Sequence, residues 1–73
     1  MAGKIKRLID EIVEARAQGN ETVYYTTQAK LTLKGIDPGK YDERTEDDPK
    51  IIERLYEIAD EMGIRLPGAS RLG

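Results

Sequence analysis

The stretch between Asn20 and Asp37 decides what this chain can fold into, because it can be interpreted in two incompatible ways. As a β-strand it alternates apolar and polar residues, which is typical of a half-buried strand. As a helix it has favourable ends, since Asn20 is a good N-cap and Gly35 followed by Ile36 is typical of a Schellman motif. In that motif Ile36 packs back on Leu31 in the last turn of the helix.

The need of a strand for a partner favours the helix. No other segment of the chain has the alternation of a strand, and a lone strand leaves its backbone N–H and C=O groups unpaired. A hairpin within the stretch would need a turn near Thr27 and Gln28, where the usual turn residues are missing. We therefore predict a helix over residues 21–34. The alternative is an α+β fold in which a central strand, residues 22–34, pairs across a homodimer.

Two amphipathic segments flank this stretch. In residues 4–18 the apolar side chains recur three and four residues apart, and Gly19 follows as a left-handed stop. In residues 49–62 a second apolar stripe follows Asp48 and Pro49, a favourable N-cap and first helical residue. The two stripes comprise Ile5, Leu8, Ile9, Ile12 and Val13, and then Ile51, Ile52, Leu55, Ile58, Ala59 and Met62.

These elements predict an all-α fold, a small three-helix bundle with the second helix in the middle. The second helix would have apolar residues on two nearly opposite sides, which is typical of a helix packed between neighbours or exposed to another chain. A single domain is expected over residues 1–66, with a flexible C-terminal tail at residues 67–73. The two sides are Val23, Tyr24, Thr27 and Leu31 on one, and Tyr25, Ala29, Leu33 and Ile36 on the other.

The composition excludes much familiar chemistry. The chain has 73 residues with no cysteine and no histidine, so disulfides, thiolate metal sites and imidazole catalysis are excluded. We therefore predict that the protein is not an enzyme and binds no cofactor. No apolar run approaches the roughly 20 residues that cross a membrane, and no signal-peptide core is present. A cytoplasmic location and no membrane partner are expected.

The connection before the third predicted helix is acidic but does not match a metal-binding motif. Counted from Asp37, the third and fifth positions of an EF-hand loop are Gly39 and Tyr41, which supply no side-chain carboxylate. We predict no metal site there. The simpler interpretation is a solvated loop whose last aspartates favour the positive end of the third helix.

Nucleic-acid binding is the alternative function. Small helix-turn-helix domains read the major groove with polar side chains of one helix. An acidic third helix and loop would oppose the phosphate contacts that dominate affinity for nucleic acids. The candidate residues for this function are Thr26, Thr27, Gln28, Lys30 and Lys34.

The tyrosines favour a protein contact surface. Tyr24 and Tyr25 are adjacent, so a helix cannot direct both rings into the same groove. Either one ring packs in the core while the other stays accessible, or both rings cover the rim of the core. We predict a non-enzymatic protein–protein interaction module that binds another protein or forms a homodimer. The expected contact residues are Tyr24, Tyr25, Ala29, Leu33 and Ile36.

Overall fold

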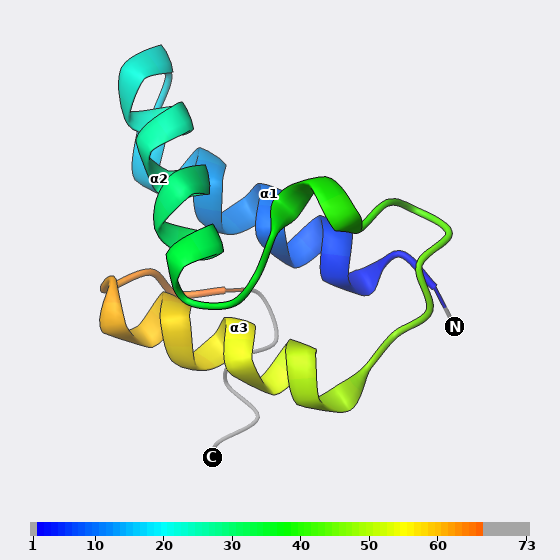
Figure 1. Cartoon of the computed structure of the whole chain (residues 1–73). Helices are drawn as coiled ribbons and strands as arrows, with labels where there is room; N and C mark the ends of the chain where they lie inside the picture. Colours follow the sequence, from blue (N-terminus) through cyan, green and yellow to red (C-terminus); the bar gives the residue numbers. More distant parts are fainter. Residues whose placement is uncertain (1, 67–73) are drawn as a thin grey trace.

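The computed structural model describes residues 2–66 and confirms the all-α fold. Its elements are α1 (Lys4–Ala17), α2 (Glu21–Leu33), the 3-10 helix η1 (Pro38–Lys40) and α3 (Pro49–Glu61), shown in Figure 1. Within the described residues, extended pairing is confined to one isolated bridge between Ala2 and Glu46. The alternative with a central strand is therefore wrong. The predicted tail, residues 67–73, lies outside the described residues.

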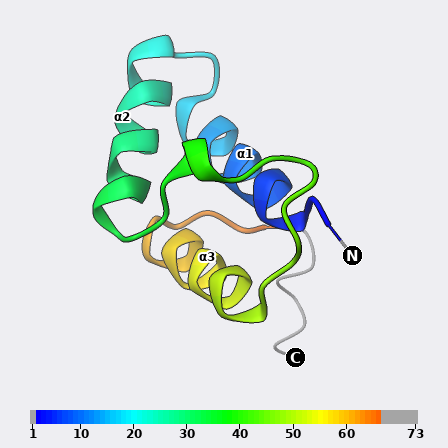
Figure 2. The same ribbon diagram turned by 45° about the vertical axis from the view of Figure 1, so that its right-hand side comes forward.

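The centre of the bundle is α1, not α2, which corrects the predicted arrangement. Helix α1 contacts both α2 and α3, and it buries more residues than either of them. In two views α1 and α3 run side by side, while α2 stands upright beside them (Figure 1 and Figure 2). The buried residues are Ile5, Leu8, Ile9, Ile12, Val13 and Ala17 of α1, Thr27 and Leu31 of α2, and Leu55, Ile58 and Ala59 of α3.

The connection between α2 and α3 accounts for this arrangement. Ile36 is buried in the core, Tyr41 packs against it, and η1 contacts α2. These residues cover apolar surface that α2 and α3 would otherwise have to cover by contacting each other. The second helix is therefore held mainly by its contact with α1.

The predicted Schellman motif is present at the end of α2, and the same motif ends α3. After α2, the N–H of Ile36 donates to the carbonyl oxygen of Leu31 at 2.9 Å. Gly35 makes this reversal with a φ of 94°, a conformation that residues with a Cβ rarely adopt. After α3, the N–H of Ile64 donates to the carbonyl oxygen of Ala59 at 2.8 Å. Both helices end one residue before their predicted ends.

The turn from α1 to α2 uses two consecutive left-handed residues. Gln18, predicted to be the last residue of the first helix, has a φ of 47°, and Gly19 follows with a φ of 87°. The N–H of Asn20 then donates to the carbonyl oxygen of Ala17 at 2.8 Å. Asn20 caps α2 as predicted, because its Oδ1 accepts from the N–H of Val23 at 3.1 Å.

The acidic connection is fastened to the start of α1. The N–H of Gly3 donates to the carbonyl oxygen of Thr45 at 3.0 Å, and the N–H of Lys4 donates to Oδ1 of Asp47 at 3.1 Å. A Cβ atom at Gly3 would lie 3.1 Å from the carbonyl oxygen of Glu43, and Gly3 has a φ of 91°. The tight contact and the left-handed backbone both favour glycine at this position. Asp47 thus places a carboxylate at the positive end of α1.

Candidate protein-contact surface

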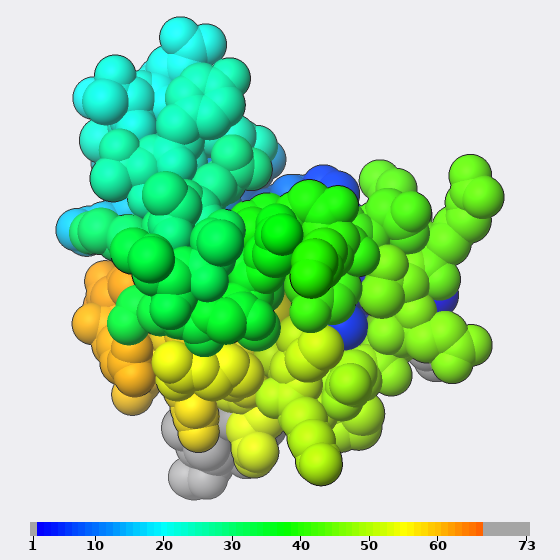
Figure 3. All heavy atoms as spheres, in the orientation of Figure 1, coloured from blue at the N-terminus to red at the C-terminus, as the bar shows by residue number. Residues whose placement is uncertain are grey.

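One side of α2 is exposed and carries no charged residue. Its members recur three and four residues apart, so they form a continuous stripe along the helix. By contrast, the exposed residues of α3 are all charged except Pro49. Figure 3 shows the upper part of α2 projecting beyond the rest of the molecule. We call this stripe the α2 face, and it consists of Thr22, Tyr25, Thr26, Ala29, Thr32 and Leu33.

Two large apolar side chains stand out on the α2 face. Leu33 is 87% exposed and Tyr25 is 62% exposed. A single exposed leucine is ordinary on a protein surface. Here, however, both side chains belong to a stripe without a charged member, and Lys30 and Lys34 border this stripe beside Leu33. Depletion of charge with enrichment of tyrosine is what distinguishes the centre of a protein–protein interface.

The two adjacent tyrosines have different environments. Tyr24 is half-buried and packs against the core, whereas Tyr25 lies on the α2 face. Their rings meet edge to face, with centroids 5.6 Å apart, a favourable arrangement for aromatic rings. Tyr24 therefore positions the ring of Tyr25 from below and offers only part of its own surface to a partner.

Of the remaining expected contact residues, Ala29 and Leu33 lie on the α2 face and Ile36 does not. Ile36 is only 4% exposed. The expectation extended the helical spacing through Ile36, but the helix ends at Leu33 and the chain reverses at Gly35. This reversal turns Ile36 from the outer side of α2 into the core.

The threonines proposed for nucleic-acid reading are held by the helix itself. Thr27 is 2% exposed, and its Oγ1 donates to the carbonyl oxygen of Val23 at 2.7 Å. Its expected place among groove-reading side chains is therefore wrong. Thr26 is exposed, but its Oγ1 donates to the carbonyl oxygen of Thr22 at 2.8 Å. Such back-bonding occupies the hydroxyl proton and leaves oxygen lone pairs for a ligand.

The other three nucleic-acid candidates have three different environments. Gln28 is half-buried, Lys30 is exposed, and Lys34 is half-buried in an ion pair with Glu61. The structure therefore does not bring the five candidates together on one face. Lys30 and Lys34 instead border the same shallow groove.

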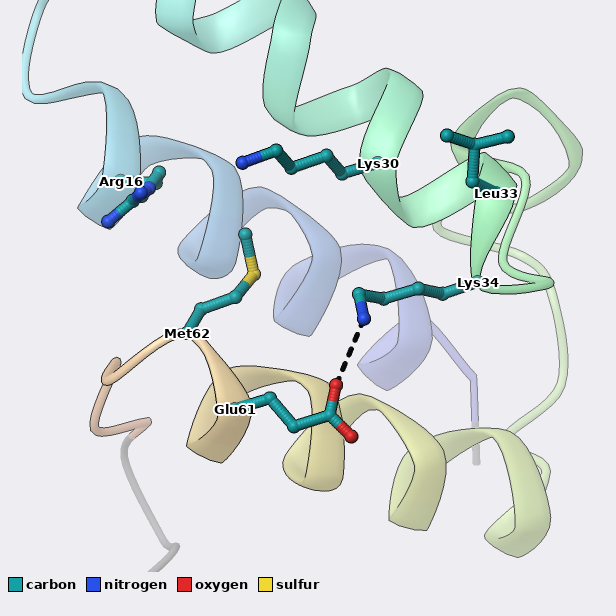
Figure 4. Close-up of a pocket in the computed structure, with 6 residues that line it drawn as sticks. All are labelled: Arg16, Lys30, Leu33, Lys34, Glu61 and Met62. Atoms are coloured by element: carbon teal, nitrogen blue, oxygen red, sulfur yellow. Dashed lines mark hydrogen bonds and ion pairs between the residues drawn. The ribbon is translucent and has the colours of Figure 1, made fainter.

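This groove lies where the C-terminal ends of the three helices meet, and it has a volume of about 510 Å³. In Figure 4, Lys30 and Lys34 extend from α2 over the groove, Met62 rises from the end of α3, and Leu33 points away. Three cations and one carboxylate line it, with a thioether and a leucine as the apolar contribution. The lining residues are Arg16, Lys30, Leu33, Lys34, Glu61 and Met62.

One side of the groove is closed by an ion pair between α2 and α3. Nζ of Lys34 donates to Oε1 of Glu61 at 3.0 Å, and Nη1 of Arg54 lies 3.8 Å from Oε2 of the same carboxylate. The hydrogen bond from Lys34, followed by the charges of Lys34 and Arg54, holds the pKa of Glu61 below its ordinary value. Glu61 therefore remains ionised at neutral pH and compensates Lys34.

Sequence reasoning did not find Arg16, Glu61 and Met62 as parts of a site. They come from the ends of two helices that are far apart in sequence, and each fits a local role. Arg16 is a cation in the last turn of α1, where it faces the negative end of the helix. Only the three-dimensional arrangement of the helix ends places it opposite Lys30.

Among residues 2–66, no three acidic side chains are arranged so that they could hold a metal ion. In the same part of the chain, none of the helices has the length and apolar character needed to cross a membrane.

Comparisons of the chain with protein-family models, with curated proteins and with solved structures found no match. The α2 face and the adjoining groove are the features of the molecule that indicate a function.

Proposed function

We propose that this chain is a non-enzymatic protein–protein interaction module whose contact surface is the α2 face. The observation that carries the proposal is the exposure of Leu33 and Tyr25 on an uncharged stripe of a chain in which 36% of the residues are charged. Binding of a protein would remove these apolar side chains from water, which is the main favourable contribution to association.

Folding alone does not account for the apolar character of this stripe. Helix α2 is anchored to the core through Thr27 and Leu31, on the side opposite the α2 face. A glutamate or a glutamine in place of Leu33 would serve a solvent-exposed helix about equally well, because their helix propensities are close to that of leucine. Contact with another protein would account for the apolar side chains Leu33 and Tyr25, which packing within this chain does not explain.

The size of the α2 face limits what it can bind alone. A helix of 13 residues is about 20 Å long and about 10 Å across. One side of it is smaller than the roughly 800 Å² that each partner buries in a stable complex. We therefore include the adjoining groove in the contact surface. A homodimer formed by the α2 face alone would therefore be weak and transient.

Photo-crosslinking tests the proposal. A photoreactive amino acid at position 33 of the full chain, in the cells that naturally make it, is expected to crosslink one distinct protein or a second copy. The matched control carries the same group at position 53, because Glu53 is exposed on α3. If position 33 yields no product, or the same products as position 53, the proposal is wrong. Fractionation of these cells would also test the cytoplasmic location, which stays a prediction.

Binding of nucleic acid is the second candidate, and the cations Arg16 and Lys30 beside the groove favour it. Titration with duplex DNA at low and moderate salt tests it, because phosphate contacts must weaken steeply as salt rises. Tight, salt-sensitive binding that Lys30→Glu abolishes would replace the proposed function by this one.

A further inference from the structure

The α2 face and the groove are adjoining parts of one surface with different chemistry. The α2 face is uncharged, while Lys30 and Lys34 follow its flank on the side of the groove. In Figure 4, Lys30 extends from α2 toward Arg16 of α1, and Met62 lies between α3 and these cations. A partner that lies along the α2 face therefore meets positive charge on one of its flanks only.

The charge of this flank is not compensated within the described residues. The groove lining holds three cations and one carboxylate, a net charge of 3 − 1 = +2, on a chain whose formal net charge is −2. Glu61 compensates Lys34, whereas neither Arg16 nor Lys30 forms an ion pair within residues 2–66. The negative end of each helix explains one cation in its last turn. It does not explain two uncompensated cations that face each other at the groove.

A second copy of this chain does not fit that charge. The single acidic residue of α2 is Glu21, in its first turn. It is nine residues from Lys30, so it lies at the opposite end of the helix and also on the opposite flank. A parallel pair separates Glu21 from the Lys30 of the other copy along the helix axis, and an antiparallel pair places them on different flanks. Two α2 helices packed on each other would therefore leave the cationic flanks of both copies without acidic partners. Like charges across an interface oppose association.

We propose that the partner segment is an acidic amphipathic helix. Its apolar residues lie on Leu33, Ala29 and Tyr25, and its carboxylates face Lys30 and Arg16. The inference rests on the proposed function and adds the chemical class of the partner to it. The mode is that of a helix bound through apolar anchors at helical spacing, and charge complementarity fixes the orientation of the bound helix.

Three fluorescein-labelled peptides test the assignment by fluorescence anisotropy with the whole chain. The first has leucines three and four residues apart and glutamates elsewhere. The second replaces every glutamate by lysine, and the third keeps the glutamates but replaces every leucine by serine. We expect the first to bind at least about tenfold more tightly than either of the others, and to weaken as salt screens the charges.

Charge reversal on the protein identifies the site. Lys30→Glu and Arg16→Glu are each expected to weaken the acidic peptide about tenfold, and the double variant is expected to bind the lysine peptide instead. Lys50→Glu is the matched control, because Lys50 is exposed at the other end of α3 and its reversal changes the net charge equally. Leu33→Ala is expected to weaken binding while the melting temperature stays unchanged.

Several results would overturn the inference. Equal binding of the acidic and lysine peptides would show that the charge of the partner does not matter. If Lys50→Glu weakened binding as much as Lys30→Glu, the net charge of the protein, and not a local site, would explain the preference for the acidic peptide. If the protein bound duplex DNA more tightly than the acidic peptide, and Lys30→Glu abolished DNA binding, the cations would instead bind phosphate groups. Sedimentation equilibrium that shows self-association lost on Leu33→Ala would assign the surface to a second copy. A position-33 crosslink to a protein without an acidic helix would leave the proposed function standing and refute the acidic class alone.

Discussion

Leu31 and Leu33 are two positions apart on the same helix and have opposite environments. Leu31 is 0% exposed, whereas Leu33 is 87% exposed. We expect Leu31→Ala to lower the free energy of unfolding by about 3 kcal/mol, because it leaves a cavity in the core. Leu33→Ala is expected to change the free energy of unfolding by less than about 0.5 kcal/mol.

Urea denaturation of both variants measures the difference, and the pair is matched because the change in helix propensity is the same. A large loss for Leu33→Ala would show that its side chain is packed.

Gln18 offers a second test at the scale of one residue. Its φ of 47° places a residue with a Cβ in the left-handed region, which costs roughly 1 kcal/mol. Gln18→Gly is expected to raise the free energy of unfolding by about 0.5 kcal/mol, since glycine relieves this cost but loses more backbone entropy on folding. Gln28→Gly, in the middle of α2, should instead lower it by about 1 kcal/mol. Thermal denaturation of the two variants should therefore show shifts of opposite sign.

Helix α2 has the least support from the core among the three α-helices. It buries two residues, whereas α1 buries six, and its threonines are poor helix formers. We expect the backbone amides in the middle of α2 to exchange with deuterium faster than those of α1 and α3, because local opening of α2 exposes little apolar surface. Hydrogen exchange followed by NMR measures this directly.

The N-cap supplies the control for that prediction. Asn20→Ala removes the side-chain acceptor for the N–H of Val23, which costs about 1 kcal/mol. It should accelerate exchange in α2 much more than in α3. Equal protection of all three helices would show that α2 opens only with the whole molecule.

The ends of the helices were the most predictable part of this fold, since they depend on local chemistry. The Asn20 cap and the reversals at Gly35 and Gly63 each involve residues within one turn of chain. Gln18 escaped prediction because non-glycine residues rarely take its conformation. Ile36 was assigned to the wrong side because the prediction extended the helical spacing to Ile36, whereas the helix ends at Leu33.

At the scale of the whole molecule, α2 and α3 are joined at their C-terminal ends by the ion pair between Lys34 and Glu61. The pKa of Glu61 is lowered, chiefly by its hydrogen bond from Lys34. A carboxyl group with a lower pKa in the folded state stabilises that state above its unfolded pKa and loses this contribution as pH falls through the folded pKa. Glu61→Gln should therefore be less stable than the parent chain at neutral pH, by less than a core substitution, since both partners are partly exposed.

Urea denaturation of the two proteins across the acidic range tests the sign. The difference in unfolding free energy between Glu61→Gln and the parent chain should shrink below the ordinary pKa of 4.5 and vanish at lower pH. A difference that persists in acid would mean that the Gln substitution acts through packing rather than charge.

The position of each helix in the bundle was less predictable than its existence. Two apolar sides on α2 suggested a helix between two neighbours, yet the outer side faces solvent and α1 occupies the centre. The pattern of a single helix does not reveal that Ile36 of the connection lies in the core and that Tyr41 packs against it. Three of the expected contact residues, Tyr25, Ala29 and Leu33, do share one exposed side. The groove is formed by the C-terminal ends of three helices that are far apart in the sequence, so no local pattern indicated it.

Helix α2 holds its place with one set of side chains and turns another set outward. Substitution of Leu33 leaves Thr27 and Leu31, the buried residues of α2, in place. Substitution of Tyr25 removes its edge-to-face contact with Tyr24 but no buried side chain. Recognition could therefore diverge rapidly among descendants of this chain while the architecture persists. The same separation makes the outward stripe a place where new binding specificities can be engineered without refolding the scaffold.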